Sequence, residues 1–347
     1  MITPLLATGI FLATDFGAIP DDGLDDHAAL TAAVEAAHDA GGGTVQLPPG
    51  ELHLDAGHLR LLSGVTITGD GASIRSRGQH SALWARFASD IAVVGFRLEG
   101  DLMPPSGALV SLSNVDGMLL DSMELINANH DSIHALVGCT DLTWTNNTID
   151  GAGDDGLNPG GGGEGIGTNG VLISGNVVRN VTNDGIHVSV MSFGVTVTGN
   201  TVIDCGRGIA FIGSHDSHIE GNTITDCDHG IETVGVAAYG PTPGMTIVGN
   251  TLTNSGVIAI EGACCAVVDN VADVIDVSGY SLEYGNTSSS GNTPGDVTCD
   301  ERIDVADLLA VLAVWGPCTP LNRADVDGSG TVDVTDLLAL LANWGTT

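Results

Sequence analysis

The chain has 347 residues, of which 43% are apolar, so a large core and a second small domain are both possible. Acids outnumber bases 43 to 9, giving a formal net charge of −34. Because phosphate groups bind basic surfaces, this charge disfavours a nucleic-acid partner, and we also expect no membrane insertion, since no run of about 18 apolar residues occurs.

The N-terminal segment predicts a short strand followed by a helix. Residues 1–13 are apolar but lack the basic start of a signal peptide, so a signal peptide is not clearly present, and residues 11–16 fit a first strand equally well. An Ala-rich stretch follows, with Asp25 or Asp26 as its cap and Leu30 on its apolar face.

The middle of the chain repeats at intervals of 20 to 29 residues, where an Asn precedes a short β-branched run. These residues are Asn147, Asn176, Asn200, Asn222, Asn250 and Asn270. Repeats of this length predict a solenoid, and the short strands between turn residues favour an all-β, right-handed parallel β-helix of about ten coils. We expect the Asn side chains to form an internal ladder that satisfies the backbone of the turns.

Together, the predicted helix, the Gly-rich residues 41–50 and the coils resemble the pectin-lyase-like superfamily of polygalacturonases and pectate lyases. The resemblance implies that the N-terminal helix covers the open end of the β-helix. It also implies a secreted carbohydrate-active protein. We expect the β-helix to span residues 1–290, followed by a linker at 291–294 and a small domain at 295–347.

One face of the β-helix is expected to gather polar side chains. Aligning the coils on a Gly-Ile step stacks two outward rows, which are Asp131, Asp155, Asp184, Arg207 and His229, and His134, Asn158, His187, Ala210 and Glu232. Asp154 adds a further carboxylate. A groove of this kind suits a linear polysaccharide, although any single Asp here could equally serve as a turn cap.

Two motifs in this region resemble those of polygalacturonase-type hydrolases: Asn129-His-Asp131 and Gly153-Asp154-Asp155. The family's Gly-His-Gly and Arg-Ile-Lys motifs are not matched. The resemblance implies that Asp154 is the general acid and that Asp131 and Asp155 activate water. An inverting hydrolase needs its acid and base carboxyls about 6.5–9.5 Å apart. The remaining polar groups would bind substrate, namely His134, Asn158, Asp184, His187, Arg207, His229 and Glu232.

The same residues leave three alternatives open. A calcium-dependent lyase acting on uronate polymers would hold one Ca²⁺ with Asp154, Asp155 and Asp184, and Arg207 or His187 would take the proton. An epimerase ranks lower, because the Asp-Pro-His motif of alginate epimerases is absent. A non-catalytic glycan-binding or adhesion solenoid is the third alternative.

Near the C-terminus, two segments repeat at a shift of 29 residues, each with oxygen donors at the spacing of a calcium loop. The ligands expected for two Ca²⁺ ions are Asp296, Thr298, Asp300, Arg302, Asp304 and Asp307, then Asp325, Asp327, Ser329, Thr331, Asp333 and Asp336, with Arg302 and Thr331 at the position of the backbone carbonyl ligand. Gly330 makes the sharp turn of the second loop. Glu301 replaces it in the first, which predicts weaker binding there.

This repeat resembles type I dockerins, which attach secreted enzymes to cohesin-bearing scaffolds. The resemblance implies a cohesin-like scaffold protein as a partner, although Val305-Ala306 and Val334-Thr335 replace the polar pair that often meets cohesin. We expect Cys299 and Cys318 to form a disulfide, which requires an oxidising, extracellular compartment. We expect a monomer.

Overall fold

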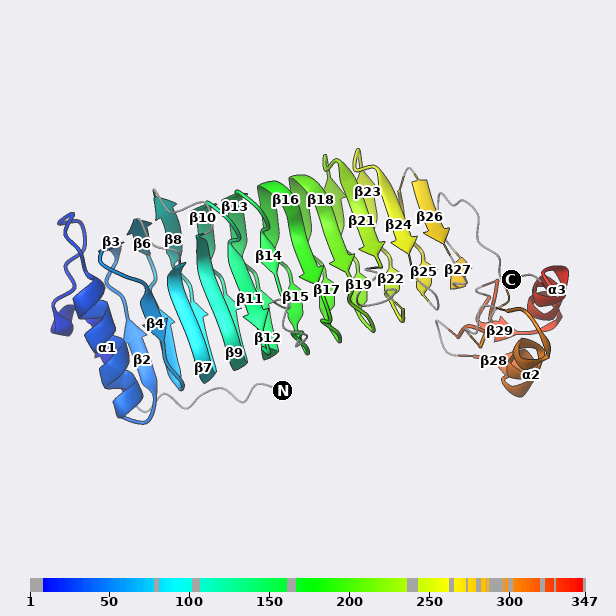
Figure 1. Ribbon diagram of the computed structural model, residues 1–347, viewed down its shortest axis with the longest axis horizontal. Helices are drawn as coiled ribbons and strands as arrows, with labels where there is room; N and C mark the ends of the chain where they lie inside the picture. Colours follow the sequence, from blue (N-terminus) through cyan, green and yellow to red (C-terminus); the bar gives the residue numbers. More distant parts are fainter. Residues whose placement is uncertain are drawn as a thin grey trace.

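The chain folds mainly into one long solenoid, and two short helices follow it (Figure 1). The computed structural model describes residues 9–77, 81–101, 107–160, 167–235, 243–261, 265–272, 274–278, 282–284, 286, 295, 297–298, 302–318, 322–327 and 329–345. Strands of successive coils pair in parallel. The predicted parallel β-helix is therefore confirmed.

Three sheets run along the solenoid, and we call them the A, B and groove sheets. The A sheet contains β1 (Ile10–Leu12), β2 (Gly43–Gln46), β5 (Val65–Thr68), the ends of β7 (Ser81–Val94) and β9 (Ala108–Asp121), β12 (Thr140–Thr145), β15 (Leu172–Ser174), β17 (Thr196–Thr198), β19 (His218–Glu220), β22 (Thr246–Val248), β25 (Ala266–Val268) and β27 (Leu282–Tyr284).

The other two sheets share the long strands that bend at a corner of the solenoid. The B sheet contains β3 (Gly50–Leu54), β6 (Ala72–Arg77), β8 (Arg97–Asp101), β10 (Glu124–Ala128), β13 (Thr148–Ala152), the starts of β16 (Val177–Ser189) and β18 (Thr201–Ile212), β20 (Thr223–Thr225) and β23 (Thr251–Thr253). The groove sheet contains β4 (Leu59–Leu61), the starts of β7 and β9, β11 (Ile133–Val137), β14 (Leu157–Asn158), the ends of β16 and β18, β21 (His229–Val234), β24 (Val257–Glu261) and β26 (Val274–Ser278).

The number of coils is lower than the ten predicted. Within the described ranges, coils with a strand in all three sheets run from β2–β3–β4 to β22–β23–β24. The next repeat is short, with only 20 residues between Asn250 and Asn270. Its B-sheet position is reduced to one isolated bridge between Val271 and Thr251.

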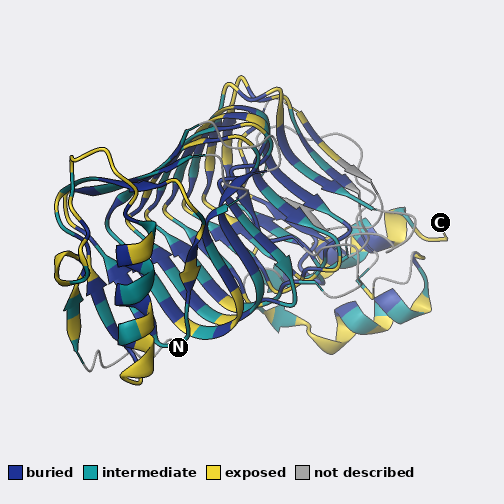
Figure 2. Ribbon diagram, turned by 60° about the vertical axis from the view of Figure 1, so that its left-hand side comes forward, coloured by how far each residue is buried: buried dark blue, intermediate teal, exposed yellow. Residues whose placement is uncertain are grey.

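The interior of the solenoid is a continuous apolar core with one buried polar ladder (Figure 2). The six Asn residues predicted to stack are at most 1% exposed. In each step, one Asn donates from its backbone N–H and its side-chain amide to the next Asn, as from Asn176 to Asn200 Oδ1, both at 2.9 Å. This confirms the internal ladder and explains why Asn recurs once per coil.

The N-terminal helix α1 (His27–Asp39) lies at the first end of the solenoid and buries Leu30 against it (Figure 1). Asp26 precedes the helix, as expected, but its side chain makes no cap hydrogen bond. Its carboxylate instead accepts from the backbone N–H groups of Ile19 and His53, each at 2.9 Å. The strand predicted over residues 11–16 is wrong beyond Leu12, because the chain then forms a 3-10 helix that ends at Gly17.

The C-terminal part contains α2 (Val305–Ala313) and α3 (Val334–Ala342), with β28 (Gly316–Pro317) antiparallel to β29 (Thr331–Val332). It has a hydrophobic core separate from that of the solenoid, formed by Ile303, Val311, Ala324, Val332 and Leu340. Both helices start with the same capping box, at Asp304 and Asp333. None of the helices in the described ranges has the length and apolar character needed to cross a bilayer.

The predicted disulfide concerns a cysteine of this C-terminal part. Cys318 is a free thiol whose Sγ donates to Asp325 Oδ2 at 3.4 Å. Cys299 lies outside the described residues. The disulfide therefore stays a prediction.

Candidate active site on the groove sheet

The outward residues of the groove sheet stack in the order that the Gly-Ile alignment predicts. His134 is paired with Asn158 on the next coil, and further along Ala210 is paired with Glu232. The second row pairs Asp184 with Arg207. The structure therefore brings the predicted carboxylates, imidazoles and arginine onto one face over five coils.

Asp131 is fully buried at the base of this face, with 0% exposure. Its Oδ1 accepts from His130 Nδ1 at 3.0 Å and from the backbone N–H of Asp155 at 3.1 Å. Its Oδ2 accepts from His134 Nδ1 at 2.8 Å and from Asn158 Nδ2 at 3.4 Å. Burial alone would raise the pKa of Asp131, but hydrogen bonding to His134 and the charges of the two imidazoles hold it below its usual value.

Asp155 is also buried, at 2% exposure, and its oxygens are similarly occupied. Its Oδ1 accepts from Asn183 Nδ2 at 3.0 Å and from the backbone N–H of Asp184 at 3.1 Å. Its Oδ2 accepts from His187 Nδ1 at 2.6 Å and from Asn158 Nδ2 at 3.0 Å. Asp131 and Asp155 therefore each hold the Nδ1 atom of one imidazole, that of His134 and that of His187.

Asp184 binds the two basic side chains that follow along this face, those of His187 and Arg207. Its carboxylate accepts from Arg207, with Nη2 2.7 Å from Oδ2, and lies 3.2 Å from His187 Nδ1. Burial raises the pKa of Asp184, although the bond from Arg207 acts against this. Glu232 accepts from His229 Nδ1 at 2.7 Å and lies 3.7 Å from Arg207 Nη1. The guanidinium is therefore shared between two carboxylates.

The imidazole of His187 has a raised pKa, and one of its nitrogens lacks a partner. Burial by itself would lower this pKa, but the hydrogen bond to Asp155 and the charge of Asp184 outweigh it. Nε2 of His187 and Oδ1 of neighbouring Asn158 are buried without a hydrogen-bond partner among the described residues. Buried polar atoms of this kind usually bind a water or a ligand.

Asp154 differs from the other carboxylates because its side chain is 41% exposed. Its Oδ2 lies 3.2 Å from His130 Nε2, and its Oδ1 accepts from Asn183 Nδ2 at 3.2 Å. Partial burial raises the pKa of Asp154, and the nearby charges of Asp155 and Asp131 raise it further. A carboxyl that keeps its proton and reaches solvent can act as a general acid.

The three carboxylates lie close together. One oxygen each of Asp131, Asp154 and Asp155 lies within 4.8 Å of the others. This spacing is compatible with a cation, as is a second cluster of the same size formed by Asp155, Asp184 and His187. The inverting arrangement of an acid and a base among these residues stays a prediction.

Comparison with known proteins identifies the family of the chain. The family described as rhamnogalacturonase A/epimerase, pectate lyase-like, matches residues 10–232. The chain belongs to this family. The chain is accordingly a pectate lyase-like β-helix protein.

Among curated proteins, this pectate lyase-like chain matches mannuronan C5-epimerases of Azotobacter vinelandii. It is 47% identical to AlgE1 over 68 residues, which are 18% of this chain and 5% of that protein. It is 32% identical to AlgE3 over 120 residues, which are 30% of this chain and 6% of that protein. The chain therefore spans only a small part of the curated relatives it matches.

Solved structures share the fold of this pectate lyase-like chain. The catalytic unit of an α-1,3-glucanase from Streptomyces thermodiastaticus has a TM-score of 0.61 at 20% identity, covering 85% of this chain and 58% of that one. An exopolygalacturonase from Thermotoga maritima has a TM-score of 0.59 at 13% identity, covering 80% of this chain and 90% of that one. At these identities, the likeness shows the fold alone.

Two residues of the pectate lyase-like site were not predicted from sequence, His130 and Asn183. His130 connects Asp131 to Asp154, and its ring stacks parallel to His134 at a centroid distance of 6.4 Å. Asn183 donates to Asp154 and to the neighbouring Asp155. His130 directly precedes Asp131 in the sequence, and Asn183 directly precedes Asp184. Their position next to predicted site residues is the feature of the sequence from which they could have been predicted.

The second predicted calcium loop has the donor geometry of a cation site. One oxygen each of Asp325, Asp327 and Asp336 lies within 4.8 Å of the others. The backbone N–H groups of Ser329 and Gly330 donate to Asp325 at 2.9 and 2.8 Å, which folds the loop around that carboxylate. Three convergent carboxylates on a tight loop fit the hard oxygen ligands that Ca²⁺ requires.

The first predicted calcium loop is described only in part. Asp296 and Asp300 lie outside the described residues. Asp307 is fully buried and accepts from Thr298 N and Oγ1, at 2.9 and 3.0 Å, and from Asp304 N at 2.9 Å. These contacts parallel those of Asp336 in the second loop, which accepts from the backbone of Asp327 and Asp333.

Proposed function

We propose that the chain is a polysaccharide hydrolase in which Asp154 is the general acid. The observation that carries this proposal is the raised pKa of the exposed Asp154 carboxyl beside two buried carboxylates. A proton held at this position can be given to the oxygen of a glycosidic bond lying in the groove. The surrounding row of imidazoles and amides offers hydrogen bonds to sugar hydroxyl groups.

We assign the activation of water to His134 rather than to Asp131 or Asp155. Both carboxylates are buried, and each already has four polar nitrogen atoms within 3.4 Å of its oxygens, so neither is free to take a proton from water. Asp131 holds Nδ1 of His134, which leaves Nε2 as the proton acceptor. The proposed acid contacts His130, whose ring lies parallel to that of His134 at a centroid distance of 6.4 Å.

The proposal is tested by replacing Asp154 with Asn and assaying reducing sugars released from a panel of neutral and acidic glycans. Loss of the general acid should lower the rate about 100-fold or more. Asp150→Asn is the matched control, because that carboxylate pairs with Arg179 on the B sheet, away from the groove. Unchanged activity in Asp154→Asn overturns the proposal, and glycan binding by the wild type without cleavage favours a non-catalytic binding solenoid.

A calcium-dependent lyase or epimerase acting on uronate polymers is the second candidate. It is favoured by the clusters of oxygen and imidazole ligands around Asp155 and by the identity with mannuronan C5-epimerases. The structure brings Asp154 and Asp184 each next to Asp155 but into separate clusters. A Ca²⁺ ion in either cluster would neutralise a sugar carboxylate, and His187 or Arg207 would move the proton. Calcium-dependent formation of unsaturated products from alginate or polygalacturonate would replace the hydrolase proposal by this one.

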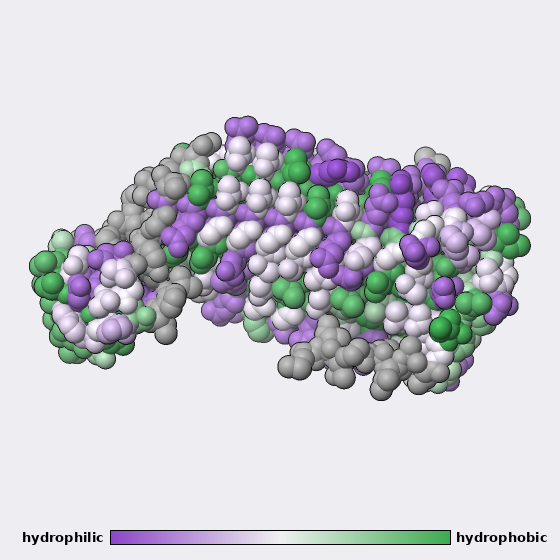
Figure 3. All heavy atoms as spheres, turned by 180° about the vertical axis from the view of Figure 1, so that it is seen from behind, coloured by the Kyte–Doolittle hydropathy of each residue, from purple (hydrophilic) through white to green (hydrophobic). Residues whose placement is uncertain are grey.

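We propose that the C-terminal part is a dockerin-like module that binds two Ca²⁺ ions and attaches the enzyme to a cohesin-like scaffold outside the cell. Its calcium ligands are supported by the carboxylate cluster of the second loop. Its partner surface is supported by exposed apolar residues at equivalent positions of both helices and their ends, which are Val305, Leu309, Leu312 and Trp315, and Val334, Leu338, Leu341 and Trp344. Figure 3 shows hydrophobic residues on the outer surface of this part.

A further inference from the structure

Basic residues are scarce in this protein, and five of the nine lie within ion-pair distance of a carboxylate. Only 9 bases accompany 43 acids. The arginines with a carboxylate within ion-pair distance are Arg75, Arg77, Arg97, Arg179 and Arg207. Among the described ion pairs, none involves Arg60 or Arg86. Two exposed guanidinium groups without a carboxylate partner are unusual on a surface with this excess of acids.

Both of these arginines lie on the groove sheet, beside the same tryptophan. Arg60 on β4 is paired directly with Trp84 on β7, and Arg86 follows two residues later on the outward side of that strand. His58 makes an edge contact with Trp84 at a centroid distance of 4.9 Å. Burial lowers the pKa of His58, and the charges of His27 and Arg60 lower it further.

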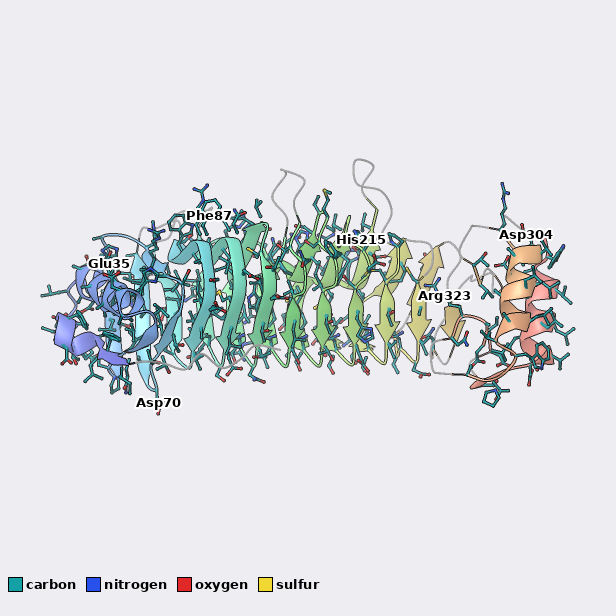
Figure 4. The ribbon with its side chains drawn as sticks, turned by 90° about the horizontal axis from the view of Figure 1, so that it is seen from below. Glu35, Asp70, Phe87, His215, Asp304 and Arg323 are labelled. Carbon is teal, nitrogen blue, oxygen red and sulfur yellow. The ribbon has the colours of Figure 1, made fainter. Side chains whose placement is uncertain are left out.

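Phe87 completes this group at the edge of the groove sheet. Arg86 lies over its ring, 5.0 Å from the centroid. The Phe87 side chain is 70% exposed, and Figure 4 shows it at the edge of the solenoid. Its φ of 51° is a left-handed conformation that disfavours a bulky residue, whereas the next two coils have Asn114 and Gly138 at this corner. Such backbone strain is most often retained at binding sites.

We propose that His58, Arg60, Trp84, Arg86 and Phe87 form an anion-binding sugar subsite, which we call the arginine patch. A sugar ring would stack on the indole, and a carboxylate or sulfate on that sugar would bind Arg60 and Arg86. A planar carboxylate and a tetrahedral sulfate ester each present a pair of oxygens that can accept the two parallel N–H groups of a guanidinium. This inference rests on the proposed function, because the ligand is another unit of the same polysaccharide.

The distance between the patch and the reaction centre defines the substrate further. Trp84 belongs to the same outward row as Ser111, His134 and Asn158, so it lies three coils from the coil of Asp154. At the usual spacing of strands, this is about 14 Å along the groove. The carboxylates around Asp154 would repel an anionic sugar in the absence of a cation, whereas the arginine patch would attract it. The substrate is therefore a glycan with a neutral sugar at the bond that breaks and an anionic sugar several units away.

The test measures binding by calorimetry of short, size-defined fragments of polygalacturonate and κ-carrageenan, which can occupy the arginine patch without reaching Asp154, and of pullulan fragments of the same size. The protein is the full chain with Asp154→Asn, so that no bond is broken during the measurement. We expect one anionic polymer to bind at least about tenfold more tightly than neutral pullulan, and the Arg60→Gln/Arg86→Gln pair to raise its Kd about tenfold or more. Polygalacturonate and κ-carrageenan distinguish carboxylate from sulfate as the anion that is recognised.

Two further variants separate binding from folding. Phe87→Asn should weaken binding severalfold while leaving thermal stability unchanged or higher, because Asn tolerates a positive φ. Arg179→Gln removes one positive charge from the B sheet and should change Kd less than about twofold, because that surface is outside the groove.

The other possible outcomes overturn either the arginine patch or the hydrolase proposal, but not both. Equal binding of pullulan, no binding of either anionic polymer, or an equal loss in Arg179→Gln overturns the arginine patch. The hydrolase proposal fails separately, when the wild type and Asp154→Asn release the same amount of reducing sugar. The binding result remains valid in that case, because it does not depend on cleavage.

Discussion

At the scale of single residues, burial separates carboxylates that the sequence presents as equivalent. Asp131 and Asp155 are buried, and each holds the Nδ1 atom of a histidine. Asp154 is the neighbour of Asp155 in sequence, but its side chain reaches solvent and has a raised pKa. Burial therefore distinguishes the proposed proton donor, Asp154, from the two carboxylates that hold the histidines.

His130 should control the pH range in which Asp154 acts. The charge of His130 lowers the pKa of Asp154 and acts against the burial and the carboxylates that raise it. A general acid is active only while protonated, so activity falls as the pH rises through its pKa. His130→Gln should therefore shift the alkaline limb of the pH–rate profile to higher pH, whatever the change in maximal rate.

The matched control for this prediction is His218→Gln. His218 pairs with Glu220 on the A sheet, outside the groove, so its loss should leave the profile in place. An alkaline limb that stays fixed in His130→Gln, or moves to lower pH, would show that Asp154 is not the acid. Initial rates of reducing-sugar release between pH 4 and 9, taken in steps of about half a unit, provide the measurement.

At the scale of elements, the Asn ladder contributes a repeated set of buried hydrogen bonds that side-chain packing cannot replace. Asn200 Nδ2 donates to Ile173 O at 3.0 Å and to Asn222 Oδ1 at 3.0 Å. Asn200 Oδ1 accepts from the backbone N–H and side chain of Asn176. Each coil therefore depends on the coils before and after it.

Asn200→Ala should lower the free energy of unfolding of the solenoid by about 3 kcal/mol or more, because several buried donors and acceptors lose their partner. Thr223→Ala is a suitable control, since Thr223 is exposed beside the ladder and its loss should cost about 0.5 kcal/mol or less. Urea denaturation followed by circular dichroism measures both. Equal stability of Asn200→Ala and the wild type would mean that the ladder contributes little.

At the scale of the whole molecule, regular features could be predicted from the sequence and local geometry could not. The period of the Asn residues and the Gly-Ile steps fixes the coils and the outward rows, because every coil must bury the same positions. The sequence could not tell that Asp131 would be buried and Asp154 exposed, since depth depends on neighbouring coils. His130 escaped prediction because a contact between two coils joins its ring to Asp154.

The solenoid and the C-terminal part have separate hydrophobic cores, so they should unfold separately. If the second loop binds Ca²⁺, removing the ion leaves Asp325, Asp327 and Asp336 close together and repelling one another. A ligand at about 100 times its Kd stabilises a fold by about 2.7 kcal/mol. We therefore expect EDTA to lower the smaller transition by about 10 °C or more and to leave the larger one unchanged.

Differential scanning calorimetry with Ca²⁺, with EDTA and with EDTA followed by excess Ca²⁺ measures both transitions, and Asp325→Asn should reproduce the effect of EDTA on the smaller one. No response of the smaller transition would exclude the calcium proposal for the C-terminal part. A fall of the larger transition has a different meaning. It would locate a second ion in the groove, where Asp155 and Asp184 meet, and would favour the calcium-dependent lyase over the hydrolase, because only the lyase mechanism uses an ion there.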